Sequence, residues 1–191
     1  MKNLFDNTQI AFSLKSDTEL ERAYFLFKLI ANEPLVRIGT AVTNFAIKAS
    51  LPVEGLIRAT VFDHFCGGVN EDDSLKVVDK LFTKGGSSVL DYSVEGEEEE
   101  EVFDFTCEEI VRTVNRADGD PRVPITVFKL TGIARFALLE KLDAKQELNT
   151  NEVAEFERVK ARCLKICQVA FDRKVPIMID AEDSWIQNTI D

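Results

Sequence analysis

The chain has 191 residues, a formal charge of −11 and 45% hydrophobic residues, and these values exclude several classes of protein. A chain of this length and composition can bury a core without disulfides or a structural metal. The negative charge would repel a phosphate backbone, and no stretch combines clustered Lys and Arg with aromatic residues. We therefore expect a globular protein with no nucleic-acid partner.

Cysteine usage and the absence of long apolar runs suggest a cytoplasmic location. Cys66, Cys107, Cys163 and Cys167 form no CxxC pair, and the only histidine is His64. We interpret the cysteines as buried free thiols in a reducing compartment and predict no metal site. No signal peptide pattern and no run of eighteen apolar residues occurs. We expect neither secretion nor a membrane-spanning helix.

The first part of the chain, residues 1–86, is predicted to be helical. Residues 16–19 offer a cap before ELERAYFLFKLIA, whose apolar positions cover most of a helix circumference. This helix should therefore be buried or should pack between partners. Further helices are expected over 34–48, 52–65 and 70–85.

After Gly86 the pattern changes to alternating strands and helices. Short apolar runs predict strands at 87–93, 123–132 and 175–182. Helices are expected between and before them, over 97–115, 133–147 and 151–173. This alternation, with strands that are apolar along most of their length, predicts an α/β fold with a parallel sheet.

Each predicted strand ends in charged residues. Toward its carboxyl-terminal side, SSVLDYSVEG supplies Asp91 and Glu95, ITVFKLTG supplies Lys129, and IMIDAEDS supplies Asp180 and Glu182. In a barrel of alternating strands and helices, active sites form at the carboxyl ends of the strands. We therefore expect these residues at an active site. A purely structural alternative is that the acidic residues after the third strand cap the next helix.

Lys129 is the most informative of these residues. It is flanked by apolar residues in ITVFKLT, so its charge needs a carboxylate or an anionic ligand, and Asp91 and Asp180 are the expected partners. Two chemistries remain open at this point. Lys129 could form a Schiff base as an aldolase nucleophile, or act as an electrostatic partner in flavin-dependent hydride transfer.

Three motifs, SSVLDYSVEG, ITVFKLTG and MIDAEDSWIQ, resemble in this order the first three barrel strands of the proline dehydrogenase family. LIRATVFDHFCGG resembles the segment that precedes the barrel in that family. The resemblance implies a helical region over 1–86, followed over 87–191 by the first three βα units of a (β/α)8, TIM-like barrel. The family's later motifs, an Arg-Gly-Ala-Tyr stretch and a final helix with paired arginines, do not occur. We therefore expect an incomplete barrel that is inactive alone.

The resemblance also implies an activity and a set of site residues. The activity is FAD-dependent oxidation of L-proline to Δ1-pyrroline-5-carboxylate in proline catabolism, with electrons passing to a quinone. Lys129 matches the lysine beside the flavin that helps to hold the proline carboxylate, and Asp180 matches the aspartate that supports this lysine and the network under the flavin. Asp91 matches a first-strand aspartate of the same network. Glu95 matches the loop glutamate that pairs with a substrate-binding arginine.

Two questions remain open at the level of sequence. The chain could instead be a non-catalytic helical and α/β interaction module that has kept barrel-like motifs. The N-terminal helices could form a structural arm against the barrel, or a docking surface for another subunit or a membrane, where a quinone resides. The resemblance therefore extends the expected location to a cytoplasmic protein with peripheral contact at an inner membrane face.

Overall fold

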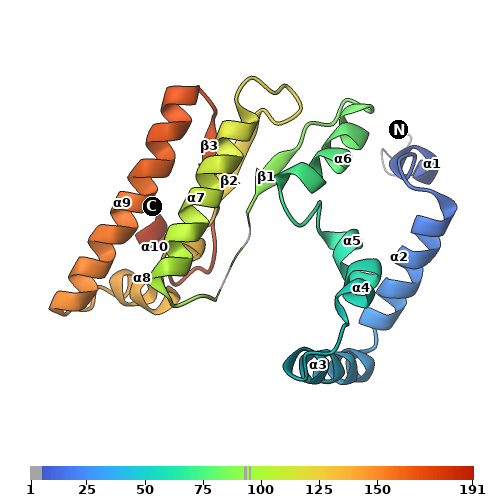
Figure 1. Cartoon of the computed structure of the whole chain (residues 1–191), viewed down its shortest axis with the longest axis horizontal. Helices are drawn as coiled ribbons and strands as arrows, with labels where there is room; N and C mark the ends of the chain where they lie inside the picture. The colour runs from blue at the N-terminus through green and yellow to red at the C-terminus, as the bar shows by residue number, and fades with distance from the viewer. Residues whose placement is uncertain (1–5, 93, 95) are drawn as a thin grey trace. The chain divides into compact units, whose positions relative to one another are not determined.

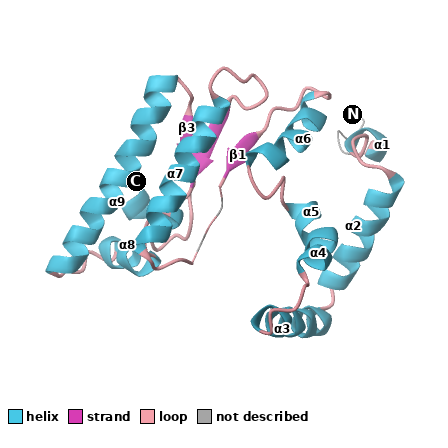
Figure 2. Ribbon diagram, viewed as in Figure 1, coloured by secondary structure: helices cyan, strands magenta, loops and turns pink. Residues whose placement is uncertain are grey.

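A computed structural model describes residues 6–92, 94 and 96–191 of the chain. It divides into two units, Met1–Lys80 and Leu81–Asp191, each of which is described by itself. Figures 1 and 2 show that helices predominate and that a small sheet lies in the second unit. No helix in the described ranges is long and apolar enough to cross a membrane.

The first unit consists of helices. They are α1 (Thr8–Ala11), α2 (Asp17–Ile30), α3 (Glu33–Lys48), α4 (Glu54–Ile57), the π-helical turn η1 (Arg58–Phe62), α5 (Asp63–Phe65) and α6 (Glu71–Phe82), the last of which runs into the second unit. The predicted cap of α2 is present: the Ser16 Oγ accepts a hydrogen bond from the Glu19 N–H at 3.3 Å, and the Glu19 carboxylate accepts one from the Ser16 N–H at 2.7 Å. The single helix predicted over 52–65 is instead interrupted by η1.

The described part of the first unit buries little apolar surface. Its buried apolar residues are Leu26, Ala46 and Val78. On α2, Leu26 is buried, whereas Tyr24 is 71% exposed and Phe25 is 63% exposed. The expectation that α2 is buried is therefore wrong for this chain by itself, because one helical unit of this size cannot cover an apolar surface that extends around most of the helix. Packing of α2 between partners stays a prediction.

The second unit contains the sheet. Its elements are β1 (Val89–Asp91), α7 (Glu100–Ala117), β2 (Ile125–Phe128), the 3₁₀ turn η2 (Leu130–Gly132), α8 (Phe136–Asp143), α9 (Thr150–Arg173), β3 (Ile177–Ile179) and α10 (Gln187–Ile190). The strands are parallel, in the order β1-β2-β3, so the predicted α/β class is confirmed. The helix expected from Glu97 begins at Glu100, because Glu99 is extended (φ −94°, ψ 132°).

Helices α7 and α9 pack together on the sheet. One core unites residues of α7, β2 and α9: Cys107, Ile110, Phe128, Val159 and Ile166. Both crossover helices therefore cover the same face of the sheet, as the ribbon of Figure 1 also indicates. We call this the covered face and the opposite one the open face.

The register and the alternation of side chains assign residues to the two faces. Thr126 pairs with Leu90 on one side and Ile177 on the other, so the covered face carries Leu90, Thr126, Phe128, Ile177 and Ile179. Val127 pairs with Asp91 and Met178, so the open face carries Val89, Asp91, Ile125, Val127 and Met178. Phe128 is 0% exposed, whereas Met178 is 43% exposed. The two faces therefore differ in burial along β1 and β2, whereas on β3 the covered-face residue Ile179 is 41% exposed, much like Met178.

A buried arginine joins α7 to α9. The Arg162 guanidinium donates to Asp104 at 2.7 Å, to the Ile133 carbonyl at 3.2 Å and to the Glu100 carboxylate. Hydrogen bonds from Arg158 and then Arg162 outweigh the effect of burial and hold the pKa of Glu100 at about 2. The ion pairs therefore satisfy the charge that α9 buries at the core edge.

Candidate functional site

Three residues selected from the sequence lie at one edge of the sheet. Asp91 is the last residue of β1, Lys129 follows β2 directly, and Asp180 follows β3 directly. The strands are parallel, so their carboxyl ends meet at the same edge. The Asp180 N–H donates to the Phe128 carbonyl at 2.9 Å, which extends the β2–β3 ladder and brings Asp180 next to Lys129.

The same three residues also belong to one face. Asp91 pairs with Val127, and Val127 pairs with Met178. Lys129 and Asp180 lie two positions beyond Val127 and Met178, so alternation places them on the open face with Asp91. Lys129 is half-buried, and both aspartates are exposed. The open face therefore combines apolar strand residues with a charged edge; the roles of the three charged residues stay predictions.

A hydrogen-bonded pair lies beside this edge. The Glu182 carboxylate accepts a hydrogen bond from the Thr131 N–H at 3.1 Å and another from the Thr131 hydroxyl. Thr131 is buried in the turn η2, which starts directly after Lys129. The sequence pattern predicts Glu182 as a strand-end carboxylate, but it places Thr131 within the strand predicted over 123–132. The available signal was the Thr-Gly pair that follows the apolar run, because such a pair favours a turn.

The turn η2 also packs closely against its other neighbours. A β-carbon added at Gly132 would lie 3.2 Å from the Val94 carbonyl oxygen and 3.5 Å from the Thr106 Cγ2. The segment after β1 and helix α7 thus both approach this turn. The predicted loop glutamate, Glu95, lies outside the described residues.

Two of the four thiols lie in surroundings that make them poor nucleophiles. Burial raises the pKa of Cys107, and burial together with the neighbouring Cys167 raises the pKa of Cys163 to about 11. Such thiols are protonated at neutral pH and are poor nucleophiles. The prediction of four buried thiols is confirmed only for Cys107, because Cys163 and Cys167 are half-buried and Cys66, where the chain leaves α5 as coil, is exposed. No group of three metal-ligating side chains occurs in the described ranges.

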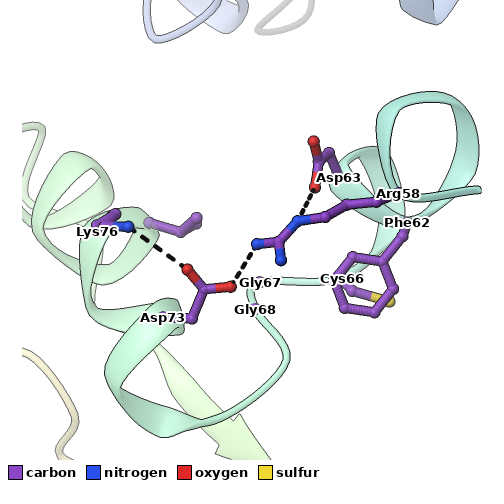
Figure 3. Close-up of a pocket in the computed structure, with 9 residues that line it drawn as sticks. Arg58, Phe62, Asp63, Cys66, Gly67, Gly68, Asp73 and Lys76 are labelled. Atoms are coloured by element: carbon purple, nitrogen blue, oxygen red, sulfur yellow. Dashed lines mark hydrogen bonds and ion pairs between the residues drawn. The ribbon is translucent and has the colours of Figure 1, made fainter. Parts of the chain in front are cut away.

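A pocket of about 250 Å³ lies within the first unit, lined by residues of η1, α5, α6 and the Gly67-Gly68 segment. Figure 3 shows that its charges pair with one another. Arg58 contacts Asp73 at 2.7 Å and Asp63 at 3.5 Å, and Lys76 contacts Asp73 at 3.5 Å. The pocket is smaller than typical small-molecule sites and its charges neutralise each other, so the strand-end edge is the better candidate.

Comparison with known proteins identifies one family. The model of the family described as proline dehydrogenase matches residues 74–191, more than half of the chain. This region includes Asp91, Lys129, Asp180 and Glu182.

Three curated relatives illustrate the similarity. The chain is 25% identical to "Proline dehydrogenase 1, mitochondrial" of Arabidopsis thaliana over 94% of its length. It is 36% identical to the protein of the same name from Caenorhabditis elegans. That alignment covers 49% of the present chain and 15% of the Caenorhabditis protein. The chain is also 26% identical, over 86% of its length, to "Carbapenem antibiotics biosynthesis protein CarD" of Pectobacterium carotovorum. The chain spans 44% of the length of the Arabidopsis and Pectobacterium relatives.

Proposed function

The chain belongs to the proline dehydrogenase family, and from this premise we propose that it supplies part of a site that oxidises L-proline to Δ1-pyrroline-5-carboxylate with FAD. The carrying observation is the placement of Asp91, Lys129 and Asp180 at one strand-end edge and on the open face. All three lie inside the region that the family model matches.

The proposed setting of this site is a (β/α)8 barrel of which residues 87–191 form the first three βα units, with residues 1–86 as a helical region before it. Strand order and helix placement support this proposal. The strands follow one another in sequence order, and both crossover helices pack on one face. A doubly wound sheet would place helices on both faces, whereas a barrel leaves the inner face for its own core and active site.

The composition of the open face fits a flavin. Val89 is 44% exposed and Met178 is 43% exposed, and they share this face with the charged edge. A flat apolar ring system with polar edges can contact both kinds of surface. Lys129 and Asp180 would be among several residues that contact FAD, which when bound accepts a hydride from the proline carbon next to the ring nitrogen.

Lys129 is proposed to bind the substrate carboxylate. A lysine ammonium is a compact cation with three donors, and a charge-assisted hydrogen bond to a carboxylate is roughly twice as strong as a neutral one. Asp180 would orient Lys129, and Asp91 would extend this polar network. The same roles were implied by the resemblance in sequence, and Glu95 is proposed for the loop that closes over the substrate.

The electron acceptor and location belong to the same proposal. We propose that a quinone receives the electrons, which would require peripheral contact with a membrane from the cytoplasmic side. The Arabidopsis and Caenorhabditis relatives are named as mitochondrial proteins.

The test compares two proteins by visible absorption: the 191-residue chain, and an extended protein in which this chain is continued to the length of its relatives. We expect only the extended protein to carry a flavin band, and L-proline added without oxygen should bleach it. If neither protein carries the band, the interaction-module alternative takes the place of this proposal. Trapping of a substrate on Lys129 by borohydride would instead support the aldolase alternative.

A further inference from the structure

We infer that Glu182 is a positioning residue for Lys129 and acts through Thr131. The inference rests on the proposed function, because it assigns Lys129 to the substrate carboxylate. It concerns two residues that the family resemblance in the sequence did not assign, and it starts from the two hydrogen bonds that the Glu182 carboxylate accepts from Thr131.

The turn η2 needs an acceptor at its start. The first N–H groups of a helical turn have no partner within the turn and are usually capped by a side chain that precedes it. The residue at this position is Lys129, whose side chain has no acceptor, and it makes no capping bond. Glu182 supplies the missing acceptor from the segment after β3 and satisfies the Thr131 N–H.

Hydrogen bonds on both sides of Lys129 join its backbone segment to the segment after β3; we call these two connections ties. On one side the Asp180 N–H donates to the Phe128 carbonyl at 2.9 Å. On the other side Glu182 accepts from Thr131. Lys129 lies between Phe128 and Thr131, so both ends of its backbone segment are bound to the segment that carries Asp180. The spacing between Lys129 and Asp180 thus depends on both ties.

The turn η2 is also anchored by residues that lie in the hydrophobic core. Leu130 is 6% exposed and Ile133 is 0% exposed, and both belong to the core between α7 and α9. The Gly132 N–H donates to the Lys129 carbonyl at 3.2 Å and closes the turn. With these anchors fixed, the Glu182 carboxylate and the Asp180 N–H together set the distance between the Lys129 backbone and the segment after β3.

The chemistry of the side chain explains why a carboxylate serves here. An ionised carboxylate has only acceptors, so it can take both Thr131 donors at once. Glutamine has one acceptor oxygen and an NH₂ group that would face a donor, and alanine has no acceptor. Loss of the tie should therefore be graded, from full in Glu182→Ala to partial in Glu182→Gln.

A first measurement uses the 191-residue chain. Hydrogen exchange followed by NMR should show a protected Thr131 amide in the parent, faster exchange in Glu182→Ala, and parent-like exchange in the control Asp183→Ala, which changes an exposed carboxylate in the same segment. The melting temperature of each variant reports global stability. Equal Thr131 exchange in the parent and in Glu182→Ala, with equal melting temperatures, would overturn the inference.

A second measurement uses the extended protein and the rate of flavin reduction by L-proline. We expect about a tenfold to a hundredfold slower reduction in Glu182→Ala, since a displacement of about 1 Å can cost a factor of about 10². Thr131→Val, which removes the hydroxyl, should also show slower flavin reduction. Thr131→Ser keeps both donors and should show the parent rate.

A double-variant cycle separates this inference from the proposed function. If Glu182 acts through Lys129, then adding Glu182→Ala to Lys129→Ala should cause little further loss in affinity for a non-oxidisable five-membered-ring carboxylate. Independent, additive losses would overturn the positioning role while leaving Lys129 as a substrate residue. No effect of Lys129→Ala alone on rate or affinity would instead refute the proposed role of Lys129, and with it the inference.

Discussion

The covered and open faces of the three-stranded sheet share the same strands but differ in what surrounds them. On the covered face, Thr126 is 1% exposed and Phe128 is 0% exposed, under α7 and α9. On the open face, the neighbouring Met178 is 43% exposed and Asp91 is exposed. Within β1 alone, Leu90 is 9% exposed and Val89 is 44% exposed, so one short strand packs residues on one face and leaves residues on the other accessible.

The two faces should also respond differently to substitution. Substitutions that remove a packed side chain from the covered face should lower the free energy of unfolding. Substitutions on the charged edge of the open face should lower activity with little change in stability, because the side chains there are exposed or half-buried.

The largest effect is expected at Phe128. Phe128→Ala should destabilise the chain by about 3–5 kcal/mol, because it removes a fully buried ring and leaves a cavity. The matched control is Met178→Ala on the open face, where we expect a loss below about 1 kcal/mol because much of the side chain is already in water. Urea unfolding of both variants provides the measurement, and equal losses would mean that the two faces do not differ.

A large effect on activity is expected at Asp180. In the extended protein, Asp180→Ala should slow proline-dependent flavin reduction by about a hundredfold, because Lys129 loses the residue proposed to orient it. The melting temperature should stay near that of the parent, since Asp180 is exposed. A variant that keeps the parent rate, or that fails only because it unfolds, would contradict the assignment of this edge to function.

An intermediate effect is expected on the stability of the chain at acid pH, through Glu100 at the start of α7. The pKa of Glu100 is about 2 in the folded chain because of hydrogen bonds from Arg158 and Arg162, whereas the ordinary value is 4.5. The folded value is the lower one, so this contribution is fully present above about pH 4.5 and is lost as the pH falls toward 2.

Glu100→Gln should accordingly reduce stability at pH 7 by about 1 kcal/mol and flatten the loss of stability between pH 4.5 and 2. Thermal unfolding at a series of pH values provides the measurement. The control Glu101→Gln changes an exposed residue in the same helical turn and should leave the pH profile as in the parent. An unchanged profile in Glu100→Gln would show that its ion pairs do not stabilise the α7–α9 contact.

The smallest effect is a gain in stability on the covered face. The buried Thr126 hydroxyl has no hydrogen-bond partner within the described ranges. Thr126→Val keeps the shape and removes the unsatisfied group, so we expect a gain below about 1 kcal/mol. Thr113→Val is the control, because the Thr113 hydroxyl donates to the Glu109 carbonyl at 3.0 Å and its loss should not stabilise the chain. A destabilised Thr126→Val would contradict the description of this hydroxyl.

The α/β class and the parallel strands could be predicted because apolar runs such as IMI and ITVF are typical of buried parallel strands. Periodicity was less informative about boundaries. The strand predicted over 123–132 is shorter in the structure and ends at Phe128, because the turn η2 begins at Leu130. The charged strand ends were predictable for the same reason as the strands: each polar residue stands directly after an apolar run.

The contacts of single residues could not be predicted from the sequence. Thr131 contacts Glu182, which is 51 positions away in the sequence, and Arg162 contacts Glu100, which is 62 positions away. Hydrophobic periodicity relates residues only a few positions apart, so it does not predict such contacts. The exposure of α2 was also missed, because an apolar helix indicates a buried surface without saying whether this chain covers it.

The central claim is that the charged edge of the open face belongs to a proline-oxidising site. Its most direct test is stopped-flow reduction of the extended protein by L-proline without oxygen, in the parent and in Lys129→Ala, with melting temperatures measured in parallel. The account predicts a bound flavin in both proteins, similar stability, and reduction slower by about 10² to 10³ in the variant, as for the loss of one electrostatic donor. Reduction at the parent rate in Lys129→Ala would contradict it.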